Sequence, residues 1–161
     1  MRHALLLFVT LAAAACGFHL RGTAELPFSS VYVPGATAGI ALDLARNLRA
    51  GTSVKLVDSP KQAEAILEFT GETRAKEILS LTGTGRVREF RLRYRVGFRV
   101  HDGKGNDYVP QSVLELTRDV TFNDADVLAK ESEEQLLYRD MQGDMVQQIM
   151  RRLSSAPKPK A

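Results

Sequence analysis

The sequence predicts an α+β fold in which two helices pack on one face of a small mixed, mostly antiparallel sheet, in the order β-α-β-β-β-β-α. Three observations predict it. The segment 90–100 alternates strictly between apolar and polar residues, which is typical of a strand with one buried and one wet face. The long segments 63–81 and 109–122 are suited to lie beside it in the sheet. The segments 37–50 and 125–153 carry apolar residues at helical spacing.

The segment 86–100 is the predicted centre of the sheet. Its apolar face is formed by Phe90, Leu92, Tyr94, Val96, Phe98 and Val100. The opposite face carries a stripe of arginines, with Gly97 as the gap: Arg91, Arg93, Arg95 and Arg99. Because two helices cover only one face of such a sheet, we expect the arginines on the face without helices.

The sequence of the first half of the domain predicts two short strands and a helix. Strands are expected over 30–34 and 53–57, the second followed by a turn. Between them, a helix over 37–50 is expected to be capped by Thr37 and ended by Gly51. Its buried stripe consists of Ile40, Leu44 and Leu48.

The strand 63–81 is expected to bend at Gly71, and glycine-rich turns at 81–85 and 102–106 connect it and the central strand to 109–122. Odd positions of the bent strand are mostly apolar (Ala65, Leu67, Phe69 and Leu79) and even positions are acidic (Glu64, Glu68 and Glu72). This pattern predicts that its odd positions face the helices throughout.

The last helix, 125–153, is expected to begin after a cap at Asn123 or Asp124. Its apolar stripe consists of Leu137, Met141, Met145, Ile149 and Leu153, and Arg151 and Arg152 close it in the sense that suits the helix dipole. The polar, proline-containing tail 154–161 is expected to be disordered.

The N-terminus predicts secretion and a lipid anchor. Residues 4–15 form an apolar core that is too short to span a bilayer and suits a signal peptide. Cys16 follows small residues at its end and resembles the lipidated cysteine of bacterial lipoproteins; the alternative is an ordinary signal that ends near a cysteine. We therefore expect a signal peptide over 1–15, a lipidated tether over 16–28 and one domain over 29–153.

Composition excludes several classes of protein. The chain has 161 residues, a net charge of +3 and one cysteine, which leaves no internal disulfide and no cysteine-based metal cluster. His19 and His101 have no neighbours at metal-ligand spacing, and the glycines lack the spacing of a phosphate-binding loop. We therefore predict no cofactor, no metal and no enzymatic activity.

The arginine face has three interpretations. Acids on the neighbouring strands (Glu68, Glu72, Glu115 and Asp119) would make it a solvated ladder of ion pairs, each worth about 0.2–1 kcal/mol. Alternatively, the face contacts a partner. Binding of nucleic acid is disfavoured, because the aromatic residues lie on the opposite face and are not available to stack on bases.

Three stretches resemble the LptE family of lipopolysaccharide-assembly lipoproteins, the outer-membrane partners of the β-barrel LptD. They are 16–22 (CGFHLRG), 116–122 (LTRDVTF) and 128–134 (LAKESEE). The resemblance implies two helices on one face of a mixed sheet. It also implies an outer-membrane lipoprotein that plugs and helps assemble the LptD barrel, and that binds lipopolysaccharide during its transport to the cell surface.

The resemblance further implies candidate binding residues. Lys130 matches a family position associated with lipopolysaccharide binding; the alternative is a surface lysine that pairs with Glu134. Arg86 and Arg88 are the nearest bases to the turn 82–85, where the family carries a basic residue and this chain does not. Cationic side chains of this kind bind phosphates of the sort that lipid A carries.

The resemblance gives the arginine face a partner as well. A barrel lumen is polar, so Arg91, Arg93, Arg95 and Arg99 are candidates for contact with its wall. The second interpretation of function is a free-standing outer-membrane lipoprotein that binds peptide or peptidoglycan through an open sheet edge.

Overall fold

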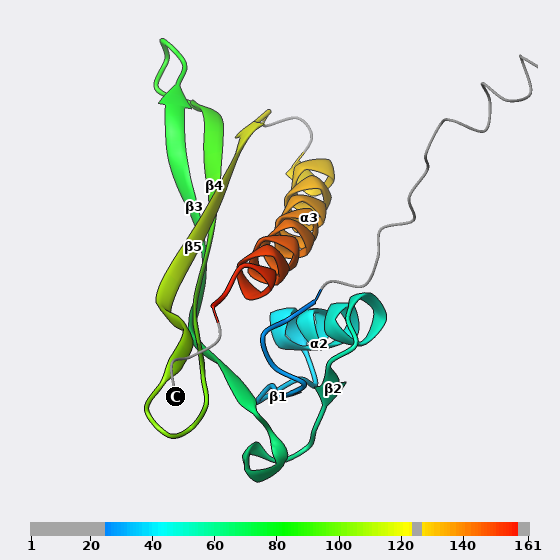
Figure 1. Cartoon of the computed structure of the whole chain (residues 1–161). Helices are drawn as coiled ribbons and strands as arrows, with labels where there is room; N and C mark the ends of the chain where they lie inside the picture. The colour runs from blue at the N-terminus through cyan, green and yellow to red at the C-terminus, as the bar shows by residue number, and fades with distance from the viewer. Residues whose placement is uncertain (1–24, 124–126, 158–161) are drawn as a thin grey trace, which may run out of the picture.

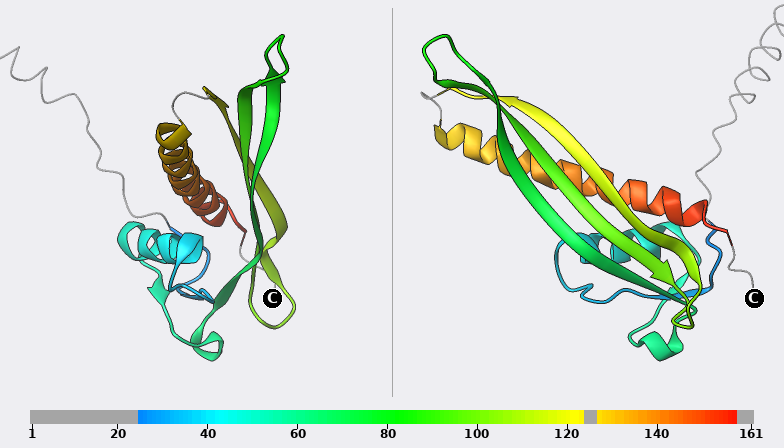
Figure 2. Two further views of the ribbon diagram at one scale, coloured as in Figure 1. Left: turned by 180° about the vertical axis from the view of Figure 1, so that it is seen from behind. Right: turned by 90° about the vertical axis from the view of Figure 1, so that its left-hand side faces the viewer.

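The chain forms two layers, a twisted sheet and a pair of helices that both lie on one side of it (Figures 1 and 2). The structure is a computed structural model and describes residues 25–123 and 127–157. The predicted signal peptide, Cys16 and most of the tether lie outside the described residues, as do Asp124 and the last four residues of the tail. The predicted α+β architecture and element order are confirmed.

The sheet is mixed and has the strand order β2-β1-β3-β4-β5. β1 pairs in parallel with β2 and β3, and the three long strands pair antiparallel. The elements are β1 (Ser30–Tyr32), α2 (Gly39–Gly51), β2 (Lys55–Leu56), a short 3-10 helix (Pro60–Gln62), β3 (Ala65–Leu81), β4 (Val87–His101), β5 (Asp107–Thr121) and α3 (Val127–Ser154).

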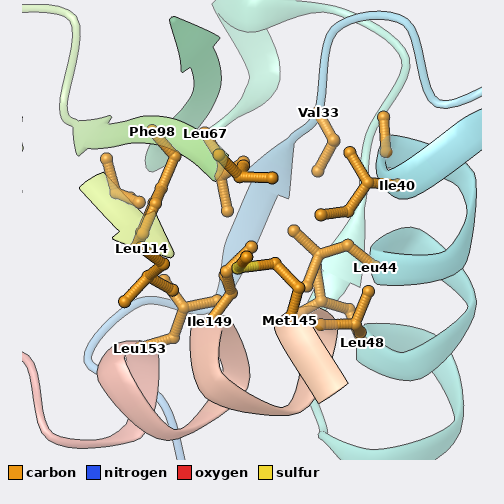
Figure 3. Close-up of a cluster of buried hydrophobic side chains, with 14 of the residues drawn as sticks. Val33, Ile40, Leu44, Leu48, Leu67, Phe98, Leu114, Met145, Ile149 and Leu153 are labelled. Atoms are coloured by element: carbon orange, nitrogen blue, oxygen red, sulfur yellow. The ribbon is translucent and has the colours of Figure 1, made fainter. Parts of the chain in front are cut away.

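The core lies between the helices and the sheet (Figure 3). The predicted helical stripes are buried, apart from Leu137 of α3, which is partly buried. The buried members are Ile40, Leu44 and Leu48 from α2, and Met141, Met145, Ile149 and Leu153 from α3. They pack with the apolar face of β4, whose predicted residues Leu92 to Val100 are buried at every second position. Burial of each such side chain stabilises the fold by about 1.5–3 kcal/mol, so this layer contact supplies much of the stability.

The ends of α2 differ from the prediction. Ala38 occupies the N-cap without a side-chain hydrogen bond, and the backbone N–H of Thr37 donates instead to the carbonyl of Gly35 at 2.7 Å. The helix also continues through Gly51. Thr52 ends it, because its hydroxyl donates to the carbonyl of Leu48 at 2.6 Å and satisfies a free helical acceptor.

The last residue of the predicted tether and the first residues of the predicted tail belong to the packed domain. Phe28 is buried and its ring lies edge-on to Tyr108, with the ring centres 5.2 Å apart. At the other end, α3 continues through Ser154, and Ala156 packs against the core. The ordered domain therefore reaches slightly beyond both predicted boundaries.

The two halves of β3 direct opposite sets of side chains toward the helices. Phe69 pairs with Phe98 and Gly71 pairs with Gly97, so one extra residue, Thr70, forms a bulge beside the predicted bend. A bulge of one residue inverts the alternation beyond it. The even positions Glu72, Arg74, Lys76 and Ile78 consequently share the helix face with the apolar residues of β4. The prediction that odd positions face the helices throughout is therefore wrong from Gly71 to Ile78. Leu79 lies at a second register shift and is 39% exposed.

Candidate functional site

The arginine face is an ion-pair ladder that spans β3, β4 and β5. Arg91 donates two hydrogen bonds to Asp119, at 2.8 and 2.9 Å. Arg93 donates to Glu115 at 2.7 Å and to Glu77 at 3.0 Å, and so connects the strands on both sides of β4. The Arg91 hydrogen bonds lower the pKa of Asp119, and the same carboxylate raises the pKa of Arg91.

The remaining two arginines of the face are paired as well. Arg95 lies 3.2 Å from Glu115, and Arg99 lies 2.7 Å from Asp107. The four predicted arginines are therefore each neutralised by a carboxylate within the sheet. Contact of this face with a barrel wall stays a prediction.

Two of the four acids expected beside the arginines have other partners. Glu72 lies on the helix face because of the bulge, and its carboxylate accepts a hydrogen bond from the Tyr94 hydroxyl at 2.9 Å. Glu68 lies 3.4 Å from His101. Glu77 and Asp107 take their places in the ladder.

A crevice lies on the helix face, between the first turns of α3 and the ends of the long strands. Its floor is apolar and its rim carries two lysines and an acid; the lining residues are Lys76, Phe90, Leu92, Val120, Phe122, Lys130 and Glu134. The rings of Phe90 and Phe122 meet edge to face with centres 5.2 Å apart. An apolar floor beneath cations is chemically suited to an anionic amphiphile. The crevice encloses only about 10 Å³, the space of a single water molecule, so entry of an acyl chain would require its lining side chains to move apart.

The two lysines of the crevice are held by acids of α3. The Nζ atom of Lys76 lies 2.6 Å from Glu134 and 4.4 Å from the centre of the Phe90 ring. The Nζ atom of Lys130 lies 2.7 Å from Glu133. In the alternative interpretation Lys130 would pair with Glu134. The structure instead pairs Lys130 with Glu133, while Glu134 pairs with Lys76 from β3.

Arg86 and Arg88 lie at the tip of the β3–β4 hairpin, close to the crevice. The backbone N–H of Arg86 donates to the Thr82 hydroxyl at 3.1 Å and closes the turn. Arg88 falls where the β3–β4 register shifts, and its carbonyl accepts from the backbone N–H of Phe122 at 2.9 Å. Phe122 also lines the crevice, so the structure brings the three predicted lipopolysaccharide-binding residues to one end of the molecule.

Large apolar side chains are exposed around the same end. Ile78 is 60% exposed and Leu81 is 55% exposed on the β3–β4 hairpin, and Leu128 is 80% exposed on the first turn of α3. We call the hairpin tip, the crevice and the first two turns of α3 the hairpin end. It combines cations with exposed apolar surface, an arrangement that marks interaction sites.

Lys76 is the site residue that sequence reasoning missed. It was not singled out from the sequence, and the bulge at Thr70 places this even position on the helix face. The sequence signal was Gly71, since a glycine inside a strand pattern often marks a bulge.

Two further kinds of feature are absent from the part of the chain that the structure describes. No group of three or more His, Cys, Asp or Glu side chains there is placed to hold a metal ion. No described helix has the length and apolar character required to cross a bilayer.

The fold and its hairpin end define a small two-layer α+β domain, with cations beside an apolar surface at one end and a neutralised polar face along the sheet. The chain belongs to the LptE family, whose model, described as lipopolysaccharide-assembly, matches residues 28–153. The resemblance carried by the three stretches of sequence is thereby confirmed, and with it a place among the lipoproteins of lipopolysaccharide assembly.

Individual relatives agree with this assignment. The chain is similar to the LPS-assembly lipoprotein LptE of Yersinia enterocolitica, with 29% identity over 167 residues that cover 95% of this chain and 77% of that protein. It is also similar to the solution structure of lipoprotein B from Nitrosomonas europaea, at 45% identity and a TM-score of 0.74, over 86% of this chain and 91% of that one. The crystal structure of the rare lipoprotein B from Shewanella oneidensis shares 27% identity at a TM-score of 0.66, over 78% of this chain and 92% of that one.

Proposed function

We propose that this chain is a lipid-anchored outer-membrane protein that plugs and helps assemble the LptD β-barrel, and that it binds lipopolysaccharide at its hairpin end. The crevice carries the second part of the proposal. It places Lys76 and Lys130 on the rim of an apolar floor built from Phe90 and Phe122. Lipid A has the matching chemistry, since it joins phosphates to acyl chains.

The ion pairs at the rim of the crevice stabilise its two lysines in the absence of a ligand. Lys76 and Lys130 each have a carboxylate partner on α3, which lowers the cost of holding a cation beside apolar walls. A phosphate that enters must replace Glu134 or Glu133 as the partner. Arg86 and Arg88 at the adjacent tip supply further cations for a ligand with more than one phosphate.

The sheet face supports the role as a barrel plug. Its arginines and acids neutralise one another, so the face is strongly polar without carrying a large charge of one sign. Such a surface suits the polar, hydrated interior of a barrel. The lipid anchor on Cys16 would hold the domain at the membrane in which the barrel is embedded.

Binding of lipopolysaccharide by purified variants tests the ligand. Lys76→Gln and Lys130→Gln are each expected to weaken binding about tenfold, as loss of a charge-assisted contact with phosphate predicts. Lys104→Gln is the matched control, because Lys104 lies in the β4–β5 turn at the other end of the long strands. Unchanged affinity in a folded Lys76→Gln, Lys130→Gln double variant would contradict the proposal.

Purification from native outer membrane in mild detergent tests the barrel partner. We expect one large, heat-modifiable β-barrel to accompany the tagged chain in equal amount. Recovery of the chain alone would contradict the plug role and would favour a free-standing lipoprotein that binds peptide or peptidoglycan.

Metabolic labelling with palmitate tests the anchor. Labelling of the intact chain is expected to disappear in Cys16→Ser, because Cys16 is the single cysteine of the sequence. Labelling that persists in this variant would place the lipid elsewhere.

A further inference from the structure

β5 is the outer strand of the sheet, beyond β4 in the order β2-β1-β3-β4-β5. Among the described residues, no strand pairs with its other side. We propose that residues 113–121 of β5 accept an extended segment of a partner protein as a sixth strand. The backbone edge of β5 is distinct from the crevice and from the arginine face, although Glu115 and Asp119 belong to the ladder of that face and Val120 lines the crevice.

The hydrogen-bonding groups along this edge can be assigned from the register. The N–H of Phe122 donates to the carbonyl of Arg88, and the pairing of β4 with β5 continues without a shift from Glu89↔Thr121 to Phe98↔Ser112. In an antiparallel ladder, alternate residues direct both backbone groups toward the neighbouring strand. The even residues of β5 therefore bond to β4, and five odd residues direct their N–H and C=O groups outward: Val113, Glu115, Thr117, Asp119 and Thr121.

The two halves of this edge differ in how they are protected. The first part of β5, residues 107–112, contains Pro110, which has no N–H to donate. The pairing of β4 with this part also shifts register, between Phe98 and Val100. Prolines and bulges of this kind discourage pairing at an open edge. The second part, residues 113–121, has neither a proline nor a register shift, and its first residue, Val113, is 52% exposed. The unprotected part of the edge thus coincides with the five outward-facing residues.

Side-chain chemistry indicates which segment fits. An added strand would lie beside Glu115 and Asp119 on the bare face. On the helix face it would lie beside Leu114, Leu116 and Val120, and beside Arg118, whose charge is paired with Asp144. β4 meets the same two rows from the other side, with arginines against the acids and apolar residues on the helix face. The carboxylates retain acceptor capacity after these contacts. We therefore expect a partner segment in which basic or hydroxyl residues alternate with apolar ones.

A second copy of this chain fits the edge less well. Symmetric antiparallel pairing of two β5 strands about Thr117 would place Glu115 directly opposite Asp119 of the other copy, twice. Like charges directly opposite each other in a sheet are destabilising. The same acids that favour a basic segment therefore disfavour self-association.

A tethered peptide tests the edge in the full-length protein in detergent. The probe is FRLRYRV, the sequence of residues 90–96, joined after Ala161 by a flexible glycine–serine linker, which gives a local concentration on the order of millimolar. Ser155 lines the same recess as Leu114, so a C-terminal tether starts near β5. Amide hydrogen exchange is then measured residue by residue.

Exchange at the five odd residues is expected to slow about tenfold or more, because the peptide takes up their outward N–H groups. The even residues are already bonded to β4 and should change little. Thr117→Pro removes one outward donor and leaves the ladder to β4 intact, so it should abolish the protection, whereas Thr117→Ala should retain it. A peptide of the same composition with the alternation scrambled is the matched control.

Equal protection by the scrambled peptide, no protection by either peptide, or protection that survives Thr117→Pro would overturn the proposal. Concentration-dependent dimerisation with protection of these amides in the untethered chain would assign the edge to a second copy and would also overturn it.

The natural occupant is identified by a photo-crosslinking residue at Thr117 in native membranes. We expect an adduct within a segment that alternates basic or hydroxyl residues with apolar ones. An adduct with a second copy of this chain, or no adduct at all, would contradict the proposal. This readout does not depend on lipopolysaccharide binding, so its failure is distinguishable from failure of the crevice.

Discussion

The Nζ atom of Lys76 in the middle of β3 lies 2.6 Å from a carboxylate oxygen of Glu134, in the first half of α3. This ion pair connects the sheet to the helix across the crevice. Glu134 therefore already pairs with the ammonium group that a ligand phosphate would bind. Stability and ligand binding at the hairpin end therefore compete for the same side chain.

Glu134→Gln is expected to separate these two effects. Loss of the ion pair should lower the free energy of unfolding by about 0.5–1 kcal/mol, as for other partly exposed pairs, and this is measured by urea unfolding. The freed Lys76 should bind lipopolysaccharide severalfold more tightly. Glu131→Gln, an exposed position on the same helix, is the control for the change in net charge. Weaker binding in Glu134→Gln would show that the carboxylate positions Lys76 rather than competing for it.

The bulge of β3 depends on a close approach at Gly97. A Cβ atom at this position would lie 2.6 Å from the Thr70 hydroxyl oxygen, closer than carbon and oxygen can approach without displacement. Gly97→Ala is therefore expected to cost about 1–3 kcal/mol of stability. Thr70→Ala removes the obstructing oxygen, so the double variant should recover part of that loss. If the losses of stability in Gly97→Ala and Thr70→Ala simply add in the double variant, the Thr70 hydroxyl is not the obstacle to a Cβ atom at position 97.

The same bulge marks the limit of what could be predicted from the sequence. Strict alternation predicted the buried face of β4 correctly, because each of its inward residues packs against the helices without interruption. The stretch of β3 from Glu72 to Ile78 was predicted on the wrong face, since a single extra residue inverts the side chains beyond it until the next register shift. Gly71 indicated a bend but did not distinguish a bend from a bulge.

The bulge also explains why only part of the candidate site could be predicted from the sequence. Lys130 was found through the resemblance, whereas Lys76 was hidden by the inverted alternation. The partner of Lys130 also could not be fixed, because residues three and four positions along a helix are both within reach of a lysine. The choice of Glu133 depends on Lys76 arriving from β3, a tertiary contact that local sequence does not encode.

Tyr94 connects the centre of β4 to β3 through its buried side chain. Its side chain is fully buried, its hydroxyl donates to Glu72 at 2.9 Å, and Arg74 lies 5.1 Å from the centre of its ring. Burial and the neighbouring carboxylate both raise the pKa of this hydroxyl, so it stays protonated as a donor. Tyr94→Phe is expected to lower the free energy of unfolding by about 1 kcal/mol, and Tyr94→Ala by about 3–5 kcal/mol. Similar losses in both variants on urea unfolding would show that the ring contributes little beyond its hydroxyl.

The β4–β5 turn gives the domain an acid-sensitive element. The carboxylate of Asp102 accepts hydrogen bonds from the backbone N–H of Lys104 at 2.7 Å and from both the backbone and side chain of Asn106. The side-chain bond from Asn106 and the backbone bond from Lys104 are the largest causes that lower the pKa of Asp102, from 3.8 to about 2. A carboxyl whose pKa is lower in the folded state binds its proton more readily when unfolded. Its contribution to stability is therefore complete above about pH 4 and is lost as the pH falls toward 2.

Asp102→Asn should remove this contribution without deleting the side chain. We expect the variant to be less stable than the parent near neutral pH and the difference to shrink between about pH 4 and 2, measured as thermal midpoints across that range. Asp58→Asn, in the turn that follows β2, provides a comparison in which another surface carboxylate is neutralised. A difference between the Asp102→Asn variant and the parent that stays constant down to pH 2 would mean that the charge of Asp102 does not hold the turn. The turn would then depend on its glycines, Gly103 and Gly105, which have positive φ angles of 73° and 108°.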